Sequence, residues 1–309
     1  MAGHRHRRRR SNRLLVVAAA LVAIAVAAVA VGIARHGGDS ATPPPDRPAT
    51  TRSAAVTAPR RTEPAPPVFT PLAMPAAPVR DALVVPVLMF HRVASADTIT
   101  NATSADLTVT PDRFAAEMAW LHRNGYHPVS QTTLFRALVD GGPLPRRPVV
   151  LTFDDGYVDD AVTVAPLLRR YGWPATFAII AGRAGEAAFL TWDQIARLDR
   201  EGFDIASHSM DHVELAGDGA ADLHRQLDDS RHMIAAHVGH PVYWFVYPAG
   251  SYDATAEAAA RDAGYLLAYT TDPGSSISSA SPMAEPRVRV HGADTPAAFA
   301  ATVGAASAG

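Results

Sequence analysis

From about residue 83 onward, short apolar runs alternate with amphipathic segments. The apolar runs have the length of buried strands and cover residues 84–90, 148–153, 175–180, 203–206, 242–246 and 266–269. Segments with helical periodicity lie between them, at residues 111–125, 160–171, 192–201, 220–237 and 254–263. Strands that alternate with helices in this way predict an α/β fold with a parallel sheet or barrel. In such folds the chemistry gathers at the carboxyl ends of the strands.

A different pattern precedes this region. Residues 14–34 form an apolar run of 21 residues behind a strongly basic segment. Such a run is long enough to span a bilayer, and the basic flank predicts residues 1–13 as a cytoplasmic tail with the rest of the chain outside the cell. A cleaved signal peptide, which would release a secreted protein, is the alternative, because residues 28–30 (AVA) resemble a cleavage site. The length of the run favours a single-pass membrane anchor.

Residues 35–82 are rich in Pro, Ala, Thr and Ser. This composition predicts a disordered, partly extended linker that holds a catalytic domain at residues 83–309 away from the membrane.

Composition removes several classes of chemistry. The chain of 309 residues has no cysteine, which excludes disulfides and cysteine metal cages, so a metal ion must be held by His, Asp or Glu. It also has no lysine, which excludes lysine-based catalysis. Residues 81–309 contain 16 of the 28 arginines and 27 of the 30 acidic residues, a balance of −11. We therefore expect no nucleic-acid partner.

Two adjacent carboxylates, Asp154 and Asp155, follow a predicted buried strand and precede Gly156. Neighbouring carboxylates repel each other unless a cation stabilises them. If one of them binds a metal ion, the other is free to act as a base beside it. A solvated Asp-Gly turn is the alternative for this motif taken alone.

His208 and His212 also follow a predicted strand, and their spacing lets both imidazoles face the same way on a helical turn. A zinc-protease motif would need a glutamate after the first histidine, which is absent, and a chance pair is the alternative. Together with Asp155 they form a set of one carboxylate and two imidazoles that leaves room for water and substrate at a divalent ion, with zinc favoured. Oxygen-activating iron also uses this set. The second carboxylate, Asp154, favours hydrolysis.

Four segments carry a resemblance to a known family. Residues 152–156, 208–212 and 245–250 resemble the first three motifs of the polysaccharide deacetylases, the NodB homology domain of carbohydrate esterases, and residues 85–92 resemble the opening strand of its extracellular branch. The resemblance covers about residues 83–303. It implies a distorted (β/α) barrel and metal-dependent removal of acetyl groups from a glycan that usually contains N-acetylglucosamine. It also implies Asp154 as the base and Asp155, His208 and His212 as metal ligands.

The third motif departs from the family pattern because the arginine that orients the base is absent. The resemblance implies the backbone N–H of Ala249 as the oxyanion donor, with Pro248 before it. Tyr247 is expected either to stack on a sugar or to pack in the core. His91 is expected either to line the cleft or to cap its strand.

The fifth motif departs as well, since the histidine that acts as general acid should follow a leucine by two residues. His291 is the candidate acid here, although that leucine is missing. Alternation along a strand places Arg287, Arg289 and His291 on one face. We hypothesise that Arg287 or Arg289 orients Asp154 in place of the missing arginine, the alternative being a solvated edge strand.

The sequence thus predicts a membrane-anchored enzyme that deacetylates an extracellular or cell-wall polysaccharide. A glycosidase with paired carboxylates is one alternative, which needs a further acid across the cleft. A non-catalytic glycan-binding protein on a stalk is another. The sequence specifies no protein partner.

Overall fold

The computed structural model describes residues 70–308. The predicted cytoplasmic tail, the predicted membrane span at residues 14–34 and most of the predicted linker lie outside the described residues. Within residues 70–308, no helix combines the length and the apolar character that crossing a bilayer requires.

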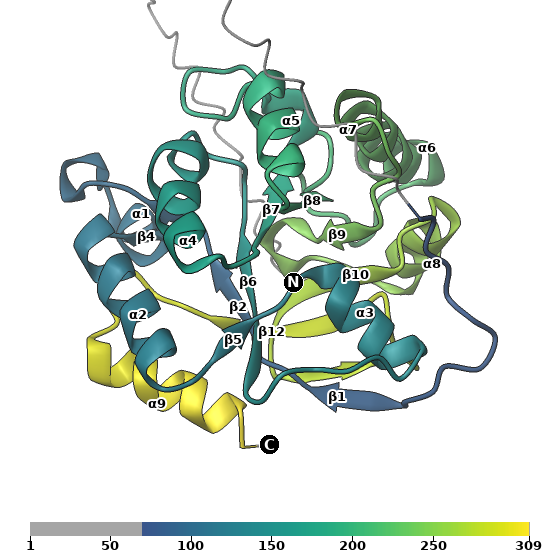
Figure 1. The fold of residues 1–309 in the computed structure, drawn as a ribbon. Coiled ribbons are helices and arrows are strands. Elements are labelled where there is room, and N and C mark those ends of the chain that lie inside the picture. The colour runs from purple at the N-terminus through teal and green to yellow at the C-terminus, as the bar shows by residue number, and fades with distance from the viewer. Residues whose placement is uncertain (1–69, 309) are drawn as a thin grey trace, which may run out of the picture. The chain divides into compact units, whose positions relative to one another are not determined.

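Seven parallel strands close into a barrel, in the order β2-β12-β10-β9-β8-β7-β6, with β6 pairing back to β2 (Figure 1). The short strand β5 (His127–Pro128) adds to the start of β6. The barrel strands are β2 Val87–Phe90, β6 Pro148–Phe153, β7 Thr176–Ile179, β8 Asp204–Ser207, β9 Trp244–Val246, β10 Leu267–Pro273 and β12 Glu285–Arg289. The expectation of a parallel α/β barrel is confirmed, and the barrel closes with its first strand between β12 and β6.

Helices cover the outside of the barrel (Figure 1). The α-helices are α1 Ala102–Leu107, α2 Pro111–Arg123, α3 Gln131–Val139, α4 Ala165–Tyr171, α5 Trp192–Arg200, α6 Ala220–His224, α7 Ser230–Val238, α8 Ala254–Asp262 and α9 Pro296–Ala306. Short 3-10 turns occur at η1 Ala96–Thr98, η3 Ala181–Arg183 and η5 Pro248–Gly250. Two π-helical turns, η2 Asp160–Val164 and η4 Arg225–Asp229, lead into α4 and α7.

Two apolar layers arise because successive strand residues point to opposite faces. On the barrel strands other than β12, one face packs in a cluster with α3, through residues such as Val87, Val150, Ala178 and Ala206. The other face packs against the outer helices, through residues such as Leu88, Leu151, Phe177 and Ile205. Both strand faces are buried, which explains why the strands read as continuous apolar runs.

Several elements differ from those predicted. The run at residues 84–90 is interrupted at Pro86, which has no N–H to donate to a ladder. Its first part is β1 (Ala82–Val84), which pairs antiparallel with β11 (Ser276–Ser278). The single helix predicted at residues 220–237 is α6, η4 and α7 in succession. The helices α1, α3 and α9 and the pair β3 (Arg92–Val93) and β4 (Thr108–Val109) were not predicted.

The folded domain begins before residue 83. The backbone N–H groups of Val79 and Arg80 donate to the carbonyls of Val139 and Leu138, at 3.0 and 3.1 Å. Leu72 and Met74 pack against the apolar cluster that contains α3. Residues 70–82, which we assigned to the linker, therefore lie against the barrel, because they offer an apolar side chain every few residues.

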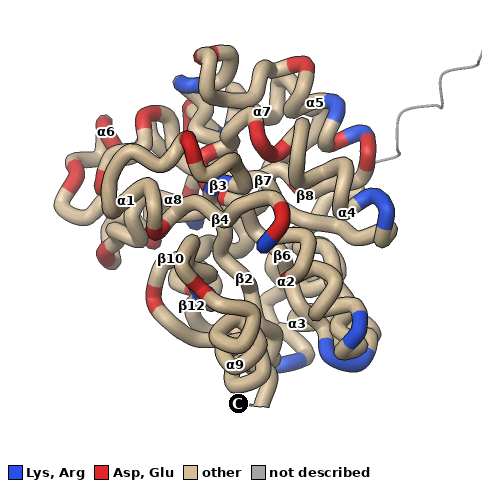
Figure 2. The backbone as a smooth tube through the Cα atoms, turned by 90° about the vertical axis from the view of Figure 1, so that its left-hand side faces the viewer, with Lys and Arg blue, Asp and Glu red and all other residues tan. Residues whose placement is uncertain are grey.

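Charge is distributed unevenly over the domain (Figure 2). Acidic positions gather around α6, where Asp218, Asp222, Asp228 and Asp229 follow closely in the sequence. Basic positions mark α4, which carries Arg169 and Arg170.

Candidate active site and metal centre

The carboxyl ends of the barrel strands surround a pocket of about 290 Å³. Asp154 and Asp155 follow β6, His208 follows β8, and His91 follows β2. All four line this pocket, as does His212. The structure thus brings together the residues of the first two motifs, although they are more than fifty residues apart in the chain.

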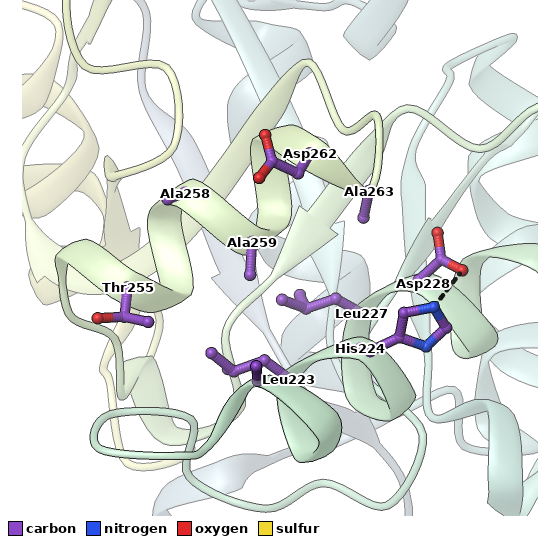
Figure 3. A pocket seen from close by; sticks show the side chains of 10 residues that line it. Leu223, His224, Leu227, Asp228, Thr255, Ala258, Ala259, Asp262 and Ala263 are labelled. Atoms are coloured by element: carbon purple, nitrogen blue, oxygen red, sulfur yellow. Dashed lines mark ion pairs between the residues drawn. The ribbon is translucent and has the colours of Figure 1, made fainter.

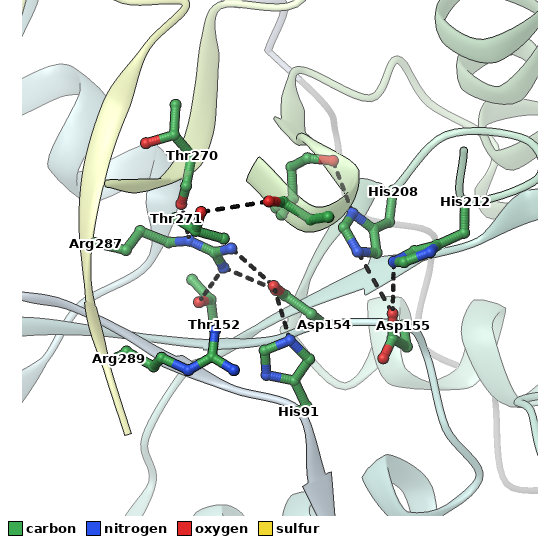
Figure 4. Close-up of polar contacts among 12 residues, drawn as sticks. His91, Thr152, Asp154, Asp155, His208, His212, Thr270, Thr271, Arg287 and Arg289 are labelled. Atoms are coloured by element: carbon green, nitrogen blue, oxygen red, sulfur yellow. Dashed lines mark hydrogen bonds and ion pairs between the residues drawn. The ribbon is translucent and has the colours of Figure 1, made fainter. Parts of the chain in front are cut away.

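The two histidines converge on Asp155 (Figure 4). Oδ1 of Asp155 lies 3.5 Å from Nε2 of His208 and 3.3 Å from Nε2 of His212. Ligand atoms that each lie about 2.0–2.1 Å from a tetrahedral zinc ion are about 3.3 Å from one another. The separations of Asp155 from the two histidines therefore match those of ligands on a divalent metal ion, and the ligand atoms all lie within 4.8 Å of one another.

A hydrogen bond sets the orientation of His208. Its Nδ1 lies 2.7 Å from the carbonyl oxygen of Val246, at the end of β9. Because a carbonyl only accepts, Nδ1 carries the proton, and Nε2 keeps the lone pair that a metal ion needs. Without a metal ion, burial would lower the pKa of His208, but Asp155 raises it, and Nε2 can also carry a proton. Burial would raise the pKa of Asp155, but the hydrogen bond and charge of this protonated His208 outweigh burial and lower it. The carboxylate is thus ionised, as a ligand must be.

The segment that carries the two histidines is not helical. Residues 208–212 form a turn in which Ser209 and His212 have left-handed backbone angles, with φ of 66° and 59°. The expected helical turn is therefore wrong. The imidazoles converge because Ser209 Oγ accepts from the His212 N–H at 2.9 Å and because Ala181 and Gly182 donate to the carbonyls of Ser209 and Met210.

Unusual backbone conformations concentrate at the site. Among the described residues, five that are not glycine have positive φ, and four of them are Asp155, Ser209, His212 and Ala249. Each such conformation costs of order 1–3 kcal/mol and persists only where the surrounding structure holds it. The strained backbone conformations are thus concentrated at the candidate metal ligands and at the pocket wall.

Asp154 is held by a buried arginine (Figure 4). Nη1 and Nη2 of Arg287, on β12, donate to its two carboxylate oxygens at 2.8 and 2.7 Å. Arg287 also donates to the carbonyl of Thr270 and to Oγ1 of Thr152. Burial would raise the pKa of Asp154, but the charge and hydrogen bonds of Arg287 outweigh burial and hold it well below its usual range.

Of the two candidate arginines, Arg287 is thus the one that contacts Asp154. Arg289 also lines the pocket, but its Nη2 pairs with Asp106 at 2.7 Å. His291 is not among the pocket-lining residues, and its Nδ1 lies 2.7 Å from the same Asp106. His91 does line the pocket, with Nε2 3.9 Å from Oδ2 of Asp154.

The third motif forms the pocket wall opposite these groups. The ring of Tyr247 is fully buried, with its centroid 5.0 Å from that of Phe245 and 5.3 Å from that of Tyr252, so it packs in the core, and Tyr247 is also among the residues that line the pocket. Pro248 is buried as well, whereas Ala249 is exposed and lines the pocket with a φ of 53°.

The pocket lining also includes residues that lie outside the sequence motifs. Thr103 and Leu107, from α1, and Thr271, from β10, also line the pocket. The capping box of Asn101 and Ser104 is the sequence signal from which α1 could have been found. Among the described residues that line the pocket, Asp154 and Asp155 are the only carboxylates. The further acid that a glycosidase needs is therefore absent from this lining.

Comparisons with known proteins point to one family. A family model described as polysaccharide deacetylase matches residues 141–268. A putative polysaccharide deacetylase YxkH of Bacillus subtilis (strain 168) is 31% identical over 218 residues, which is 71% of this chain and 75% of the relative. The poly-beta-1,6-N-acetyl-D-glucosamine N-deacetylase of Escherichia coli (strain K12) is 34% identical over 119 residues, but these are 33% of this chain and 18% of that protein. The deacetylase PplD of Streptococcus pyogenes, solved with acetate, superposes with a TM-score of 0.65 at 28% identity and covers 71% of this chain and 97% of its own.

Proposed function

The chain belongs to the polysaccharide deacetylase family, whose members are hydrolases of carbohydrate acetyl groups. From this premise we propose that it removes N-acetyl groups from a polysaccharide containing N-acetylglucosamine and that it uses a divalent metal ion as cofactor. One observation carries the proposal. Asp155, His208 and His212 converge at the spacing of metal ligands beside Asp154, a second carboxylate that a buried arginine holds in place. Zinc is the ion that this ligand set favours.

The substrate class rests on relatives. Two similar proteins, from Escherichia coli and Staphylococcus aureus, are named for N-deacetylation of poly-beta-1,6-N-acetyl-D-glucosamine. The pocket of about 290 Å³ has room for one sugar unit and its acetyl group rather than for a long buried ligand. We infer that a chain of such units lies across the pocket mouth.

Each side chain has a distinct task in this mechanism. When bound, the ion acidifies a water molecule and polarises the acetyl carbonyl. Asp154 accepts the proton of the water as its oxygen bonds to the carbonyl carbon. The backbone N–H of Ala249 stabilises the oxyanion that forms. The C–N bond then breaks, and the products are acetate and a free amine.

The amine nitrogen must receive a proton as it leaves. Within the described residues, His91 is the one imidazole of the pocket lining that does not contact Asp155. We therefore assign the proton donation to His91, which passes to the nitrogen the proton that Asp154 took from the water, rather than to His291, whose ring is paired with Asp106 outside this lining.

Acetate release from defined polymers tests the proposal. We expect chelated protein to be inactive, zinc to restore release from poly-N-acetylglucosamine, and Asp154→Asn to lower kcat by about 10²–10⁴-fold because the base is lost. Asp193→Asn, a change at an acid of α5 outside the pocket, is the matched control. Undiminished activity in chelator or in Asp154→Asn would contradict the mechanism. Peptidoglycan, chitin oligomers and acetylated xylan in parallel separate N- from O-deacetylation and identify the polymer.

We further propose that residues 14–34 anchor the enzyme in the cell membrane with its barrel outside the cell. The apolar run and its basic flank support this, and so does a polymeric substrate, which is reached outside the cell. Protease treatment of intact cells should remove the barrel from the membrane fraction. Protection of the barrel would contradict this topology.

A further inference from the structure

A second group of imidazoles and carboxylates lies on the outer side of the barrel, away from the pocket. Nε2 of His224 lies 3.4 Å from Oδ2 of Asp228, and its Nδ1 lies 3.5 Å from Oδ1 of Asp229. Nδ1 of His232 lies 3.2 Å from the same oxygen of Asp228. One ligand atom from each of His224, Asp228 and Asp229 can be chosen so that all lie within 4.8 Å of one another.

A π-helical turn creates this arrangement. In an α-helix, residues separated by five positions point about 140° apart, since each residue turns the helix by about 100°. The turn η4 (Arg225–Asp229) is wider, so that Asp228 and Asp229, at four and five positions after His224, lie on either side of its ring. Such turns are rare and occur frequently at functional sites.

The group borders a hollow between two helices (Figure 3). A pocket of about 360 Å³ runs between the α6–η4 segment and α8, and both His224 and Asp228 line it. Asp262 stands on the α8 side of the hollow and adds negative charge. An ion held by the group therefore has open positions for water or a further ligand on its pocket side.

The separations match those of the catalytic ligands. In each group a carboxylate oxygen lies 3.2–3.5 Å from two imidazole nitrogens, Asp155 in the pocket and Asp228 on η4. This is the spacing of ligands around an ion with bonds of about 2.0–2.1 Å. Imidazole with carboxylate is the ligand combination of zinc, cobalt and nickel, whereas calcium and magnesium take oxygen ligands.

We propose that His224, Asp228 and His232 bind a second divalent transition-metal ion, with Asp229 beside the other ring nitrogen of His224 as the partner that orients the ring. This site is separate from the catalytic centre and goes beyond the proposed function. It joins the last turn of α6 to the start of α7 across the π-helical turn.

The inner side of the same turn holds the catalytic loop. Oε1 of Gln226 accepts from the N–H groups of Met210 and Asp211 at 3.1 and 3.0 Å, and Arg225 pairs with the Asp211 carboxylate. His212 is the next residue in that loop. An ion on the outer side of η4 therefore stiffens the turn on which the position of His212 depends.

Zinc titration of the metal-free full-length protein tests the site by calorimetry. We expect the wild type to bind one more equivalent than His224→Ala/Asp228→Asn, with acetate release retained in the variant at saturating zinc. Asp155→Asn should keep the outer equivalent and lose the catalytic one, which separates failure of this site from failure of the proposed function. Asp222→Asn, an exposed acid on α6 outside the group, should bind like the wild type.

Cobalt provides a second measurement, because its visible absorption reports imidazole and carboxylate ligands directly. Part of the cobalt spectrum should disappear in His224→Ala and persist in Asp155→Asn, with circular dichroism confirming that each variant is folded. Equal zinc equivalents in the wild type and in folded His224→Ala/Asp228→Asn would overturn the proposal.

Discussion

At the scale of single residues, the pairing with Arg287 sets the orientation and the charge of the Asp154 carboxylate. Both side chains are buried, although Asp154 borders the pocket, and the guanidinium donates to both carboxylate oxygens. A buried pair of this kind contributes less to net stability than its geometry suggests, but the loss of one partner leaves a buried charge without compensation.

Arg287→Met should therefore lower the free energy of unfolding by about 3–5 kcal/mol, raise the pKa of Asp154 and reduce kcat. The double variant Asp154→Asn/Arg287→Met should regain much of the stability in urea titrations but none of the activity. Arg289→Met breaks a partly exposed pair with Asp106 and should cost about 0–1 kcal/mol. A stable, fully active Arg287→Met enzyme would show that the contact is incidental.

Gly250 is a second residue whose identity the structure explains. It has a φ of 70°, and a Cβ built on it would lie 2.0 Å from Oγ1 of Thr271, which lines the pocket. We expect Gly250→Ala to displace Thr271 or Ala249 and to reduce kcat. Gly239→Ala is the matched control, because its φ is 84° but no atom lies within 4 Å of the added Cβ. Kinetics and thermal unfolding of both variants separate the effect of the clash with Thr271 from that of the strained backbone angle. Equal effects of the two substitutions would refute the contribution of the contact with Thr271.

The sequence identified some of the site residues, and for others it left two candidates. Two motifs were enough to select Asp154, Asp155, His208 and His212. Alternation along a strand predicts which face of the strand a side chain lies on, but not how deeply that side chain is buried. It therefore could not show whether Arg287 or Arg289 contacts Asp154. The left-handed turn at residues 208–212 could not be predicted either, because Ser209 and His212 have positive φ without the glycine that usually signals it.

At the scale of elements, the turn η4 has the largest effect on the site. It was predicted as part of one continuous helix, because a single π-helical turn barely changes the apolar periodicity over eighteen residues. The interruption matters for function, since Gln226 and Arg225 on this turn hold the loop that ends at His212.

Gln226→Ala should therefore weaken metal binding through the loop. Removing the amide leaves the buried N–H of Met210 without its acceptor, at a cost of about 1–3 kcal/mol. It should also raise the Kd for zinc at the proposed catalytic site by about 10–100-fold, as the loss of outer-shell support typically does. Gln194→Ala removes a capping glutamine of α5 and should lower stability without changing the Kd. An unchanged Kd in Gln226→Ala would contradict this role.

At the scale of the whole molecule, buried carboxyl groups set the response to pH. Burial raises the pKa of Glu117 to about 8, of Glu285 to about 8 and of Asp204 to about 7. Both carboxylate oxygens of Glu117 lack a hydrogen-bond partner among the described residues. A group with a raised folded pKa contributes its full stability below the unfolded pKa, and this is lost as pH rises through the folded pKa.

Stability of the metal-free protein should accordingly fall as the pH rises from about 5 to 8. Glu117→Gln keeps the size of the side chain without its charge, so it should make the decline shallower and raise Tm at pH 8. Glu214→Gln, at an exposed position, should leave the profile unchanged. Thermal unfolding at several pH values in chelator measures this, and parallel profiles for the wild type and Glu117→Gln would exclude Glu117 as a cause.

The overall architecture was largely predictable, because strands buried on both faces alternate with amphipathic helices. Closure of the barrel was not, since periodicity within a segment carries no information about which distant strand it pairs with. The start of the domain was also placed too late, because the Pro-rich composition hid the few apolar residues, such as Leu72 and Met74, that pack on the barrel.

Closure of the barrel has a consequence for the order in which the protein matures. The first barrel strand, β2, must wait for β12, almost two hundred residues later, before both of its neighbours exist. Arg287 lies on β12, so a growing or truncated polypeptide that ends before Glu285 lacks the counter-charge of Asp154. Contacts between such distant segments form slowly. Asp154, the proposed catalytic base, thus gains its partner only when nearly all of the chain has been made and folded.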